Sequence, residues 1–163
     1  MNTRGVVYIH SAPSALRPHV EWAVAGVLGV PVSWHWTAQP VIPGTHRTEC
    51  SWTGPVGTGA AIASSLKGWQ KLRFEVTEEP TAGSEGTRYS YTPSLGVFHA
   101  TTGMHGDILV PELRLKQAVL QATLADRPIT EAIDELLGTP WDDELEAFRH
   151  AGEDTPVRWL HVG

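Results

Sequence analysis

Along the first half of the chain, the hydrophobic pattern changes repeatedly between the period of a strand and that of a helix. Every second position is apolar, as in a strand, in the segments 5–10, 30–36, 46–52 and 72–76. Apolar positions at helical spacing fill the segments 18–28 and 59–69 between them. The order β-α-β-β-α-β over residues 1–80 is that of ferredoxin-like domains. We therefore predict an α+β fold that begins with a ferredoxin-like sheet.

The first predicted strand carries apolar side chains on both of its faces. Val7 and Ile9 point to one face, and Tyr8 points to the other. A strand that is apolar on both faces is covered on both, so we expect it at the centre of the sheet. The helix that follows should begin near Pro18, which lacks an amide hydrogen, and should end at Gly29.

Added strands and a helical part follow residue 80. The segments 88–91 and 96–101 have strand patterns, and helices are expected from Pro111, over 128–137 and over 141–149. The helix patterns place in the core Leu113, Leu120, Leu124, Ile129, Ile133, Leu136 and Leu137. The alternating segment 157–162 predicts a terminal strand. We expect one domain over residues 1–163, with a core sheet at about 4–101 and a helical part at about 108–150.

Composition and charge narrow the classes of function. The 163 residues are 41% hydrophobic and 18% charged, which is ordinary for a globular protein. The net charge is −6, and residues 81–163 hold thirteen acidic residues against six basic ones. A polyanion would be repelled and would find no basic run, so nucleic-acid binding is disfavoured.

The sequence also lacks the features expected of secreted and membrane proteins. Cys50 is the only cysteine, which excludes an internal disulfide and a cysteine-based zinc site. No apolar run approaches the roughly 20 residues of a membrane span. The first strand starts too early to leave room for a signal peptide. We expect a cytoplasmic protein that does not bind membranes.

The chain has eight histidines, some of which could bind a metal. His99, His105 and Asp107 lie close in sequence, on a strand and in the loop after it. With His10 from the first strand they form a candidate set of imidazole and carboxylate ligands for a divalent metal. Neither His-Glu-x-x-His nor His-x-His occurs. The alternative is that His10 and His99 are hydrogen-bonded strand residues and that His105 lies in a surface turn.

Other motifs of catalysis or cofactor binding are missing from the sequence. The turn 54–59 leads from a strand into a helix, where backbone amides bind anions, but it lacks the Gly-Lys-Ser/Thr of a P-loop and the spacing of a dinucleotide site. Cys50 is expected to be a small buried residue, and Ser90 has no Gly-x-Ser-x-Gly elbow. No cofactor is predicted.

Tryptophan is abundant, with seven residues. Most are expected in the core, where each ring buries on the order of 150–250 Å². Exposed ones would mark a ligand groove or a partner interface. The candidate partner or ligand surface consists of Trp34, His35 and Trp36, together with Asp142 and Asp143 of an acidic stretch. For the acidic stretch, the alternative is a solvated helix face.

Several long segments are similar to those of a known family. They include Tyr8-Ile9-His10-Ser11-Ala12-Pro13, Gly96-Val97-Phe98-His99-Ala100, Gly106-Asp107-Ile108-Leu109-Val110-Pro111 and Pro140-Trp141-Asp142-Asp143-Glu144. The chain resembles, over essentially its whole length, an actinobacterial family of uncharacterised proteins, domain of unknown function 3145. The resemblance brings no assigned activity, cofactor or catalytic residue. The family's genes often lie near those of type II fatty-acid synthesis, which implies a link to acyl metabolism.

Two functions are compatible with the sequence. The first is a non-catalytic binding or regulatory module, whose partner is another protein or a small metabolite. A homodimer is compatible with this function. The missing catalytic motifs, the many tryptophans and the acidic second half favour it. The second is a small metal-assisted hydrolase or isomerase that uses His10, His99, His105 and Asp107.

Overall fold

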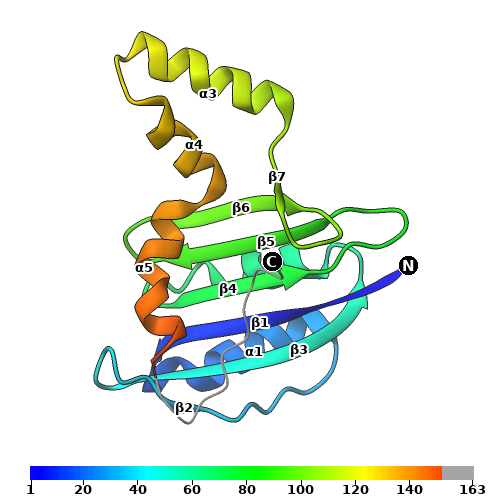
Figure 1. Cartoon of the computed structure of the whole chain (residues 1–163). Helices are drawn as coiled ribbons and strands as arrows, with labels where there is room; N and C mark the ends of the chain where they lie inside the picture. Colours follow the sequence, from blue (N-terminus) through cyan, green and yellow to red (C-terminus); the bar gives the residue numbers. More distant parts are fainter. Residues whose placement is uncertain (152–163) are drawn as a thin grey trace.

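The computed structural model describes residues 1–151 and has an α+β fold around one open sheet (Figure 1). Within these residues all neighbouring strands are antiparallel, in the order β2-β3-β1-β4-β5-β6-β7. The strands are β1 (Asn2–Pro13), β2 (Thr37–Ala38), β3 (Thr45–Pro55), β4 (Arg73–Glu78), β5 (Gly86–Thr92), β6 (Gly96–Thr102) and β7 (Ile108–Leu109). The helices are α1 (Arg17–Leu28), α2 (Thr58–Leu66), α3 (Glu112–Leu124), α4 (Ile129–Leu137) and α5 (Thr139–Arg149), with a 3-10 turn at Ser14–Leu16. The predicted strand at 157–162 lies outside the described residues.

The first strand is central, as its pattern predicts. β1 pairs with β3 on one side and with β4 on the other. Val7 and Ile9 lie in the core beneath α1 and α2, whereas Tyr8 and His10 are buried on the opposite face. α1 also ends where the sequence predicts, since Gly29 caps it with a left-handed φ of 72°.

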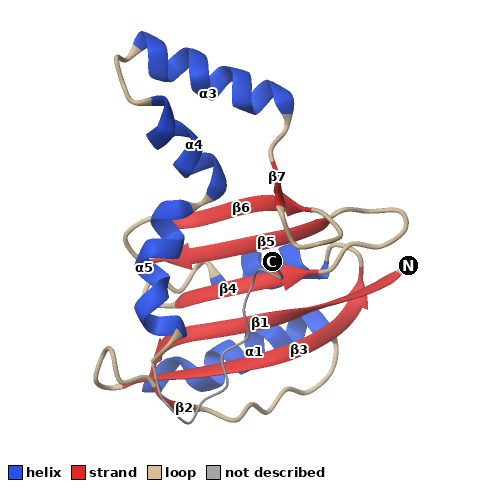
Figure 2. Cartoon of the chain, in the orientation of Figure 1, coloured by secondary structure: helices blue, strands red, loops and turns tan. Residues whose placement is uncertain are grey.

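The main hydrophobic core fills the space between the sheet and the pair α1 and α2, which lie on the same face (Figure 2). It consists of Val7, Ile9, Ala12, Val20, Val24, Trp52, Ile62, Ala63, Leu66, Leu72, Phe74, Val76 and Tyr91. The ring of Phe74 stacks on that of Tyr91, with 5.2 Å between their centroids. Trp34, Trp36 and Trp69 pack against this core from its margin, as predicted for most tryptophans. Among the tryptophans of residues 1–151, Trp22 is the exception, because 78% of it is exposed.

The segment 30–36, predicted as a strand, does not pair with any strand in the described residues. Residues 31–36 have no regular structure, and only Thr37–Ala38 pairs with β3. Exposed and half-buried residues do alternate along this segment, as predicted. Its backbone groups, however, form hydrogen bonds with side chains and not with a neighbouring strand. The Trp34 amide donates to the Glu21 carboxylate at 2.9 Å, and the Thr48 hydroxyl donates to the His35 carbonyl at 2.8 Å. Pro31 has no amide hydrogen to offer to a ladder.

The opposite face of the sheet is partly covered by α5, which crosses the strands near one end (Figure 1). Leu145 and Phe148 of α5 are buried there. The Trp141 ring lies 5.1 Å from that of Phe98, and its indole N–H donates to the Gly96 carbonyl at 2.9 Å. This second layer explains why β1 needs apolar side chains on both faces.

The helices α3 and α4 extend beyond β6 and form what we call the arm, residues 112–137 (Figure 2). The predicted helices are present, but five of the seven predicted core positions are exposed, whereas Ile133 and Leu136 are half-buried. Leu113, Leu120 and Leu124 are 66%, 58% and 77% exposed, and Ile129 and Leu137 of α4 are also exposed. A helical period shows which residues share a face, but it does not show whether another element covers that face. Among residues 1–151, no helix is long and apolar enough to cross a membrane.

Candidate functional site

The most buried group of charges in the described residues is centred on Glu75 of β4. Its side chain is fully buried on the face that α5 covers. One carboxylate oxygen accepts from His10 Nε2 and Arg149 Nε, each at 2.8 Å. The other accepts from Arg149 Nη2 at 2.9 Å and from the Ser90 hydroxyl at 3.1 Å. These residues, with Asp142, are called the Glu75 cluster below.

Three parts of the fold bring the cluster together. His10 lies where β1 has a bulge, since one extra residue shifts the register against β4 between Ile9 and Ser11. Ser90 is the cross-strand partner of Glu75 on β5. α5 supplies Arg149, whose Nη2 also donates to Asp142, two turns earlier in the helix, at 2.8 Å. The cluster therefore joins the sheet to α5.

The end of α5 is held by further buried side chains. Arg47 of β3 donates to the carbonyls of Phe148 and Ala151. Gln39 donates to the His10 carbonyl at 2.7 Å and to the Phe148 carbonyl at 3.3 Å. The last carbonyls of a helix have no partner within it, so these donors satisfy groups that burial would otherwise leave unpaired.

Opposing effects set the ionisation of the buried groups. Burial alone would raise the pKa of the Glu75 carboxyl, but the hydrogen bond and charge of His10 and the charge of Arg149 outweigh it and hold this pKa below its ordinary value. Burial lowers the pKa of Arg88, which lies nearby on β5. Glu75 is thus an anion in a site of low dielectric.

The geometry indicates a structural role for the Glu75 cluster. A carboxylate has about four acceptor positions, and four donors occupy those of Glu75. It has no free lone pair with which to take a proton from a substrate. Three cavities in the structure are lined by other residues. The cluster fastens α5 to the sheet.

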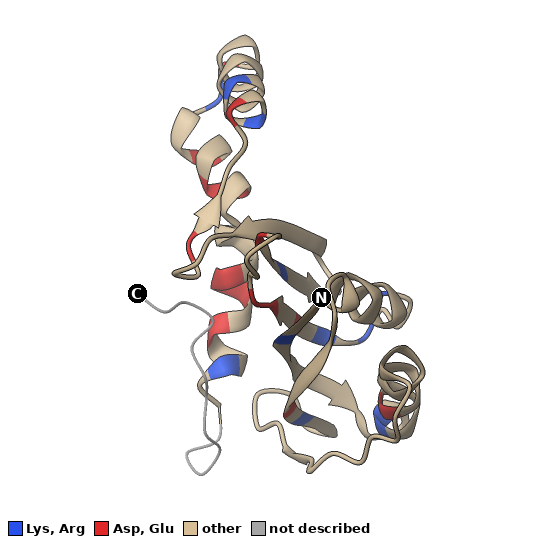
Figure 3. Ribbon diagram, turned by 90° about the vertical axis from the view of Figure 1, so that its right-hand side faces the viewer, with Lys and Arg blue, Asp and Glu red and all other residues tan. Residues whose placement is uncertain are grey.

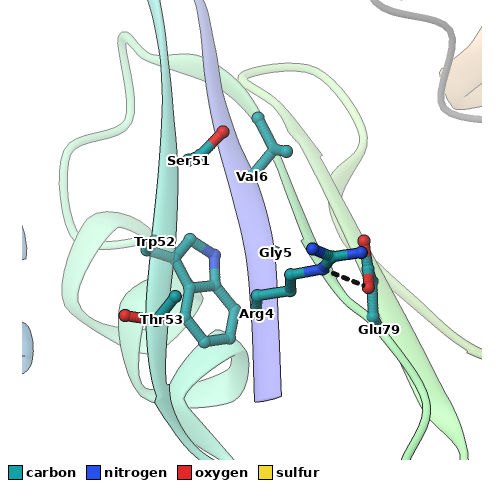
Figure 4. Close-up of a pocket in the computed structure, with 7 residues that line it drawn as sticks. All are labelled: Arg4, Gly5, Val6, Ser51, Trp52, Thr53 and Glu79. Carbon is teal, nitrogen blue, oxygen red and sulfur yellow. Dashed lines mark hydrogen bonds and ion pairs between the residues drawn. The ribbon is translucent and has the colours of Figure 1, made fainter.

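One of these cavities lies on the sheet between β3, β1 and β4 and has a volume of about 330 Å³ (Figure 4). Arg4 and Glu79 form an ion pair of 2.7 Å along its margin. Both side chains are more than half exposed, so water weakens their attraction. The rest of the lining is both polar and apolar and consists of Gly5, Val6, Ser51, Trp52 and Thr53.

The predicted metal ligands are not brought together by the structure. His10 lies beneath α5, bonded to Glu75. His99 is exposed on β6, two strands beyond β4, and stacks on Tyr89 at 4.7 Å. His99 is paired across the strands with Tyr89, and Tyr89 is paired with Val76, so the three side chains lie on the same face of the sheet. His10 lies on the opposite face. His105 and Asp107 are exposed in the following loop. Within residues 1–151, no three His, Cys, Asp or Glu side chains are placed to hold a metal ion.

The residues of the predicted partner surface are also divided between two faces. Trp34 and Trp36 pack against the core beside α1, 6.0 Å apart, and Trp36 donates to Glu21 at 2.9 Å. His35 between them is exposed. Asp142 and Asp143 lie on α5, on the other side of the sheet, and Asp142 is engaged by Arg149. These residues do not form one continuous surface.

The turn 54–59 does bind an anion, but the anion belongs to the protein. The amides of Gly57 and Gly59, at the start of α2, donate to the Glu78 carboxylate at 3.1 and 2.8 Å. Glu78 is buried, and a side chain at position 59 would meet it at 3.1 Å. This carboxylate occupies the position that a phosphate would take at the helix N-terminus.

Sequence reasoning found His10 but missed Glu75 and Arg149. The alternation Leu72, Phe74, Val76 predicts that Glu75 points away from the main core, and such positions are usually solvated. One signal was available. Because Tyr8 makes the opposite face of β1 apolar, that face had to be covered, and the neighbouring Glu75 had to be covered with it.

Acid should weaken the fold through this cluster. The ordinary pKa of the Glu75 carboxyl is 4.5, and its folded pKa is lower. Its contribution to the free energy of unfolding is therefore complete above about pH 4.5 and is lost as the pH falls through the folded pKa. Urea unfolding at a series of pH values measures this effect. Below about pH 4.5, the free energy of unfolding should fall less steeply with decreasing pH in the Glu75→Gln variant than in the wild type. Equal acid slopes for both proteins would contradict this assignment.

The comparison with protein families agrees with the sequence resemblance. The model of a family described as "Protein of unknown function (DUF3145)" matches residues 6–162. The chain belongs to the DUF3145 family. The matched DUF3145 region includes every residue of the Glu75 cluster and the whole arm. Comparisons of this DUF3145 chain with curated proteins and with solved structures found no match.

Proposed function

We propose that this DUF3145 chain is a non-catalytic protein-binding module and that α3 carries its contact surface. The observation that supports the proposal is the exposure of three leucines on one helix face. Leu113, Leu120 and Leu124 fall within about 40° of one another around α3, at 100° per residue. All three are more than half exposed. Exposed apolar side chains that gather on one face of a helix are typical of an interaction site.

The short helices of the arm and their few buried residues also favour a partner. α3 has 13 residues and α4 has 9, and each buries a single alanine, Ala122 or Ala132. Helices shorter than about 12–15 residues are marginal in water without packing against other elements. The arm receives little such packing from the rest of residues 1–151. A partner that covered α3 would supply it.

Helix recognition of this type has a known form. An amphipathic helix places apolar side chains from successive turns against a groove or another helix. We propose that the partner presents an apolar helix face to α3. The metal-assisted alternative has no specific observation in its favour, since two of the ligands proposed for it, His10 and His99, lie on opposite faces of the sheet.

Site-specific photo-crosslinking tests the proposal. Leu120→p-benzoylphenylalanine in the full chain, illuminated in cells, should give a discrete adduct whose partner peptide is an apolar helix. Leu95→p-benzoylphenylalanine is the matched control, because Leu95 is an exposed leucine in the turn between β5 and β6. The proposal fails if position 120 gives no adduct beyond the level seen at position 95.

For the fold, we propose that the first four strands with α1 and α2 form a ferredoxin-like core. α1 connects β1 to β2, β3 lies between these two strands, and β1 lies between β3 and β4. This strand order supports the split arrangement of such domains, with β2 reduced to two residues. An experimental structure in which residues 37–38 do not pair beside β3 would remove the support.

A further inference from the structure

We infer that the part of the sheet which α5 leaves open is a docking surface, and that its occupant is the segment 157–162 of the same chain. The side chains of this part lie on the face that α5 covers further along the strands. It is called the open face below and consists of Arg4, Val6, Ser51, Thr53 and Thr77. The inference concerns the sheet and not α3, so it is separate from the proposed function.

The first observation is that the apolar pattern of β1 continues beyond the region under α5. Figure 3 shows α1 and α2 on one side of the sheet and α5 on the other. Tyr8 and Val6 follow one another on the α5 side, but Tyr8 is 7% exposed, whereas Val6 is only half-buried and Arg4 is exposed. A strand with apolar side chains on both faces is covered on both. The cover that residues 1–151 provide is therefore incomplete at Val6.

A cavity marks the same part of the sheet. The cavity of about 330 Å³ between β3, β1 and β4 is lined by Val6 together with Arg4, Ser51 and Thr53 of the open face (Figure 4). Two of these residues carry hydroxyl groups, which both donate and accept hydrogen bonds. A peptide segment suits such a lining, because its backbone groups can bond to the hydroxyls while an apolar side chain covers Val6.

The second observation is the place where α5 ends. α5 begins at β6, where the indole N–H of Trp141 donates to a backbone carbonyl, and it ends at β3, where Arg47 donates to the Ala151 carbonyl. Ser51 lies four residues beyond Arg47 on β3, which is about 13 Å. The six residues from Ala151 to position 157 span up to about 20 Å of extended chain. The chain therefore leaves α5 within reach of the open face.

The third observation is the pattern of the residues that follow. The segment 157–162 lies outside the described residues, and its alternation predicts a strand. In an extended segment Val157 and Trp159 share one side, where they form an apolar surface that needs cover. The match to the DUF3145 family extends to residue 162, so this segment belongs to the same family region as the sheet.

The edges of the sheet suit this segment less well than the open face does. Residues 31–36 already border part of the outer edge of β3, where the Thr48 hydroxyl donates to the His35 carbonyl. β6 is four strand spacings from β3, or about 19 Å, and it lies at the beginning of α5. The open face includes β3 itself and is therefore nearer to the end of α5.

Photo-crosslinking within the purified full chain tests the inference. Trp159→p-benzoylphenylalanine, illuminated in dilute solution, should give an adduct of monomer size. Mass spectrometry should locate its second site on β1, β3 or β4, within residues 4–8, 49–53 or 75–79. Trp22→p-benzoylphenylalanine is the matched control, because Trp22 is an exposed tryptophan of α1 on the other side of the sheet. It should give no adduct with these three segments.

A double-mutant cycle in the full chain gives a second test with smaller changes. Trp159→Ala should lower the urea midpoint of unfolding, because it removes apolar cover from the sheet. Its effect should be smaller in a Val6→Ala background, since a shared contact is lost only once. Val97→Ala is the control background. Val97 is a 44% exposed valine of β6 on the α1 side of the sheet, so its effect should add to that of Trp159→Ala.

Each outcome of these tests decides the inference. A monomeric adduct on the open face, together with a smaller effect of Trp159→Ala in the Val6→Ala background, supports it. Additive effects of the two substitutions overturn it. An adduct elsewhere in the chain, adducts only between two copies, or no adduct at position 159 also overturns it. None of these results bears on the proposed function, whose test lies at position 120 of α3.

Discussion

Arg149→Ala is expected to lower the free energy of unfolding by about 3–5 kcal/mol, the usual cost of removing one partner from a buried ion pair. Arg149 donates twice to Glu75 and once to Asp142, and its side chain is only 9% exposed. Its loss would leave the fully buried Glu75 carboxylate with His10 and Ser90 as its remaining donors. Urea or guanidinium unfolding measures the change.

Two controls isolate the buried charge from other effects of the substitution. Arg127→Ala removes an arginine that pairs with Glu131 and Glu135 at the surface of the arm, and it should leave the unfolding midpoint nearly unchanged. The double variant Glu75→Leu/Arg149→Met removes both charges together and should cost less than Arg149→Ala alone. If Arg149→Ala and Arg127→Ala had similar midpoints, the Glu75 cluster would not be the element that fastens α5.

Gly5→Ala should destabilise the protein by more than the about 1–3 kcal/mol that overpacking usually costs. A Cβ at position 5 would lie 1.8 Å from the Thr77 carbonyl oxygen and 2.7 Å from the ring of Trp52. The Thr77 oxygen belongs to the backbone of β4, which is paired with β1 at this point. It cannot retreat without opening the ladder between the two strands.

Gly26→Ala is the matched control for this substitution. A Cβ at position 26 meets nothing within 4 Å, and the residue lies within α1. The same exchange should there stabilise the protein by about 0.5–1 kcal/mol, because alanine is the better helix former. Thermal unfolding of the two variants should shift the midpoint in opposite directions. A Gly5→Ala protein as stable as the wild type would show that β1 and β4 are not packed as described.

Much of the secondary structure could be predicted because it depends on local patterns. The central place of β1 follows from its two apolar faces, and the end of α1 follows from the freedom of Gly29 to adopt a positive φ. The segment 30–36 shows the limit of such patterns. Its alternation is correct, yet its backbone bonds to Glu21 and Thr48, and no period of residue types reveals which groups will be within reach.

The candidate sites were harder to predict, because they depend on contacts between distant segments. Two alternatives were open for His10, a metal ligand or a hydrogen-bonded strand residue. The structure confirms the second, and the hydrogen-bond partner is Glu75 from another strand. Glu75 and Arg149 are 74 positions apart in sequence, so only the docking of α5 brings them together. The apolar face of β1 at Tyr8 indicates that the neighbouring Glu75 is covered, but the local hydrophobic pattern does not identify Arg149 as its partner.

The sequence by itself determined the α+β composition, the periods of the strands and helices, and the leucine face of α3. The tertiary structure alone decided which of those faces are covered. Leu66 of α2 and Leu120 of α3 both belong to apolar helix faces, but the first is buried and 58% of the second is exposed. The physical reason is that an apolar face is buried only when a second surface packs against it. The hydrophobic pattern specifies the apolar face, and the fold or a second molecule supplies the surface that covers it.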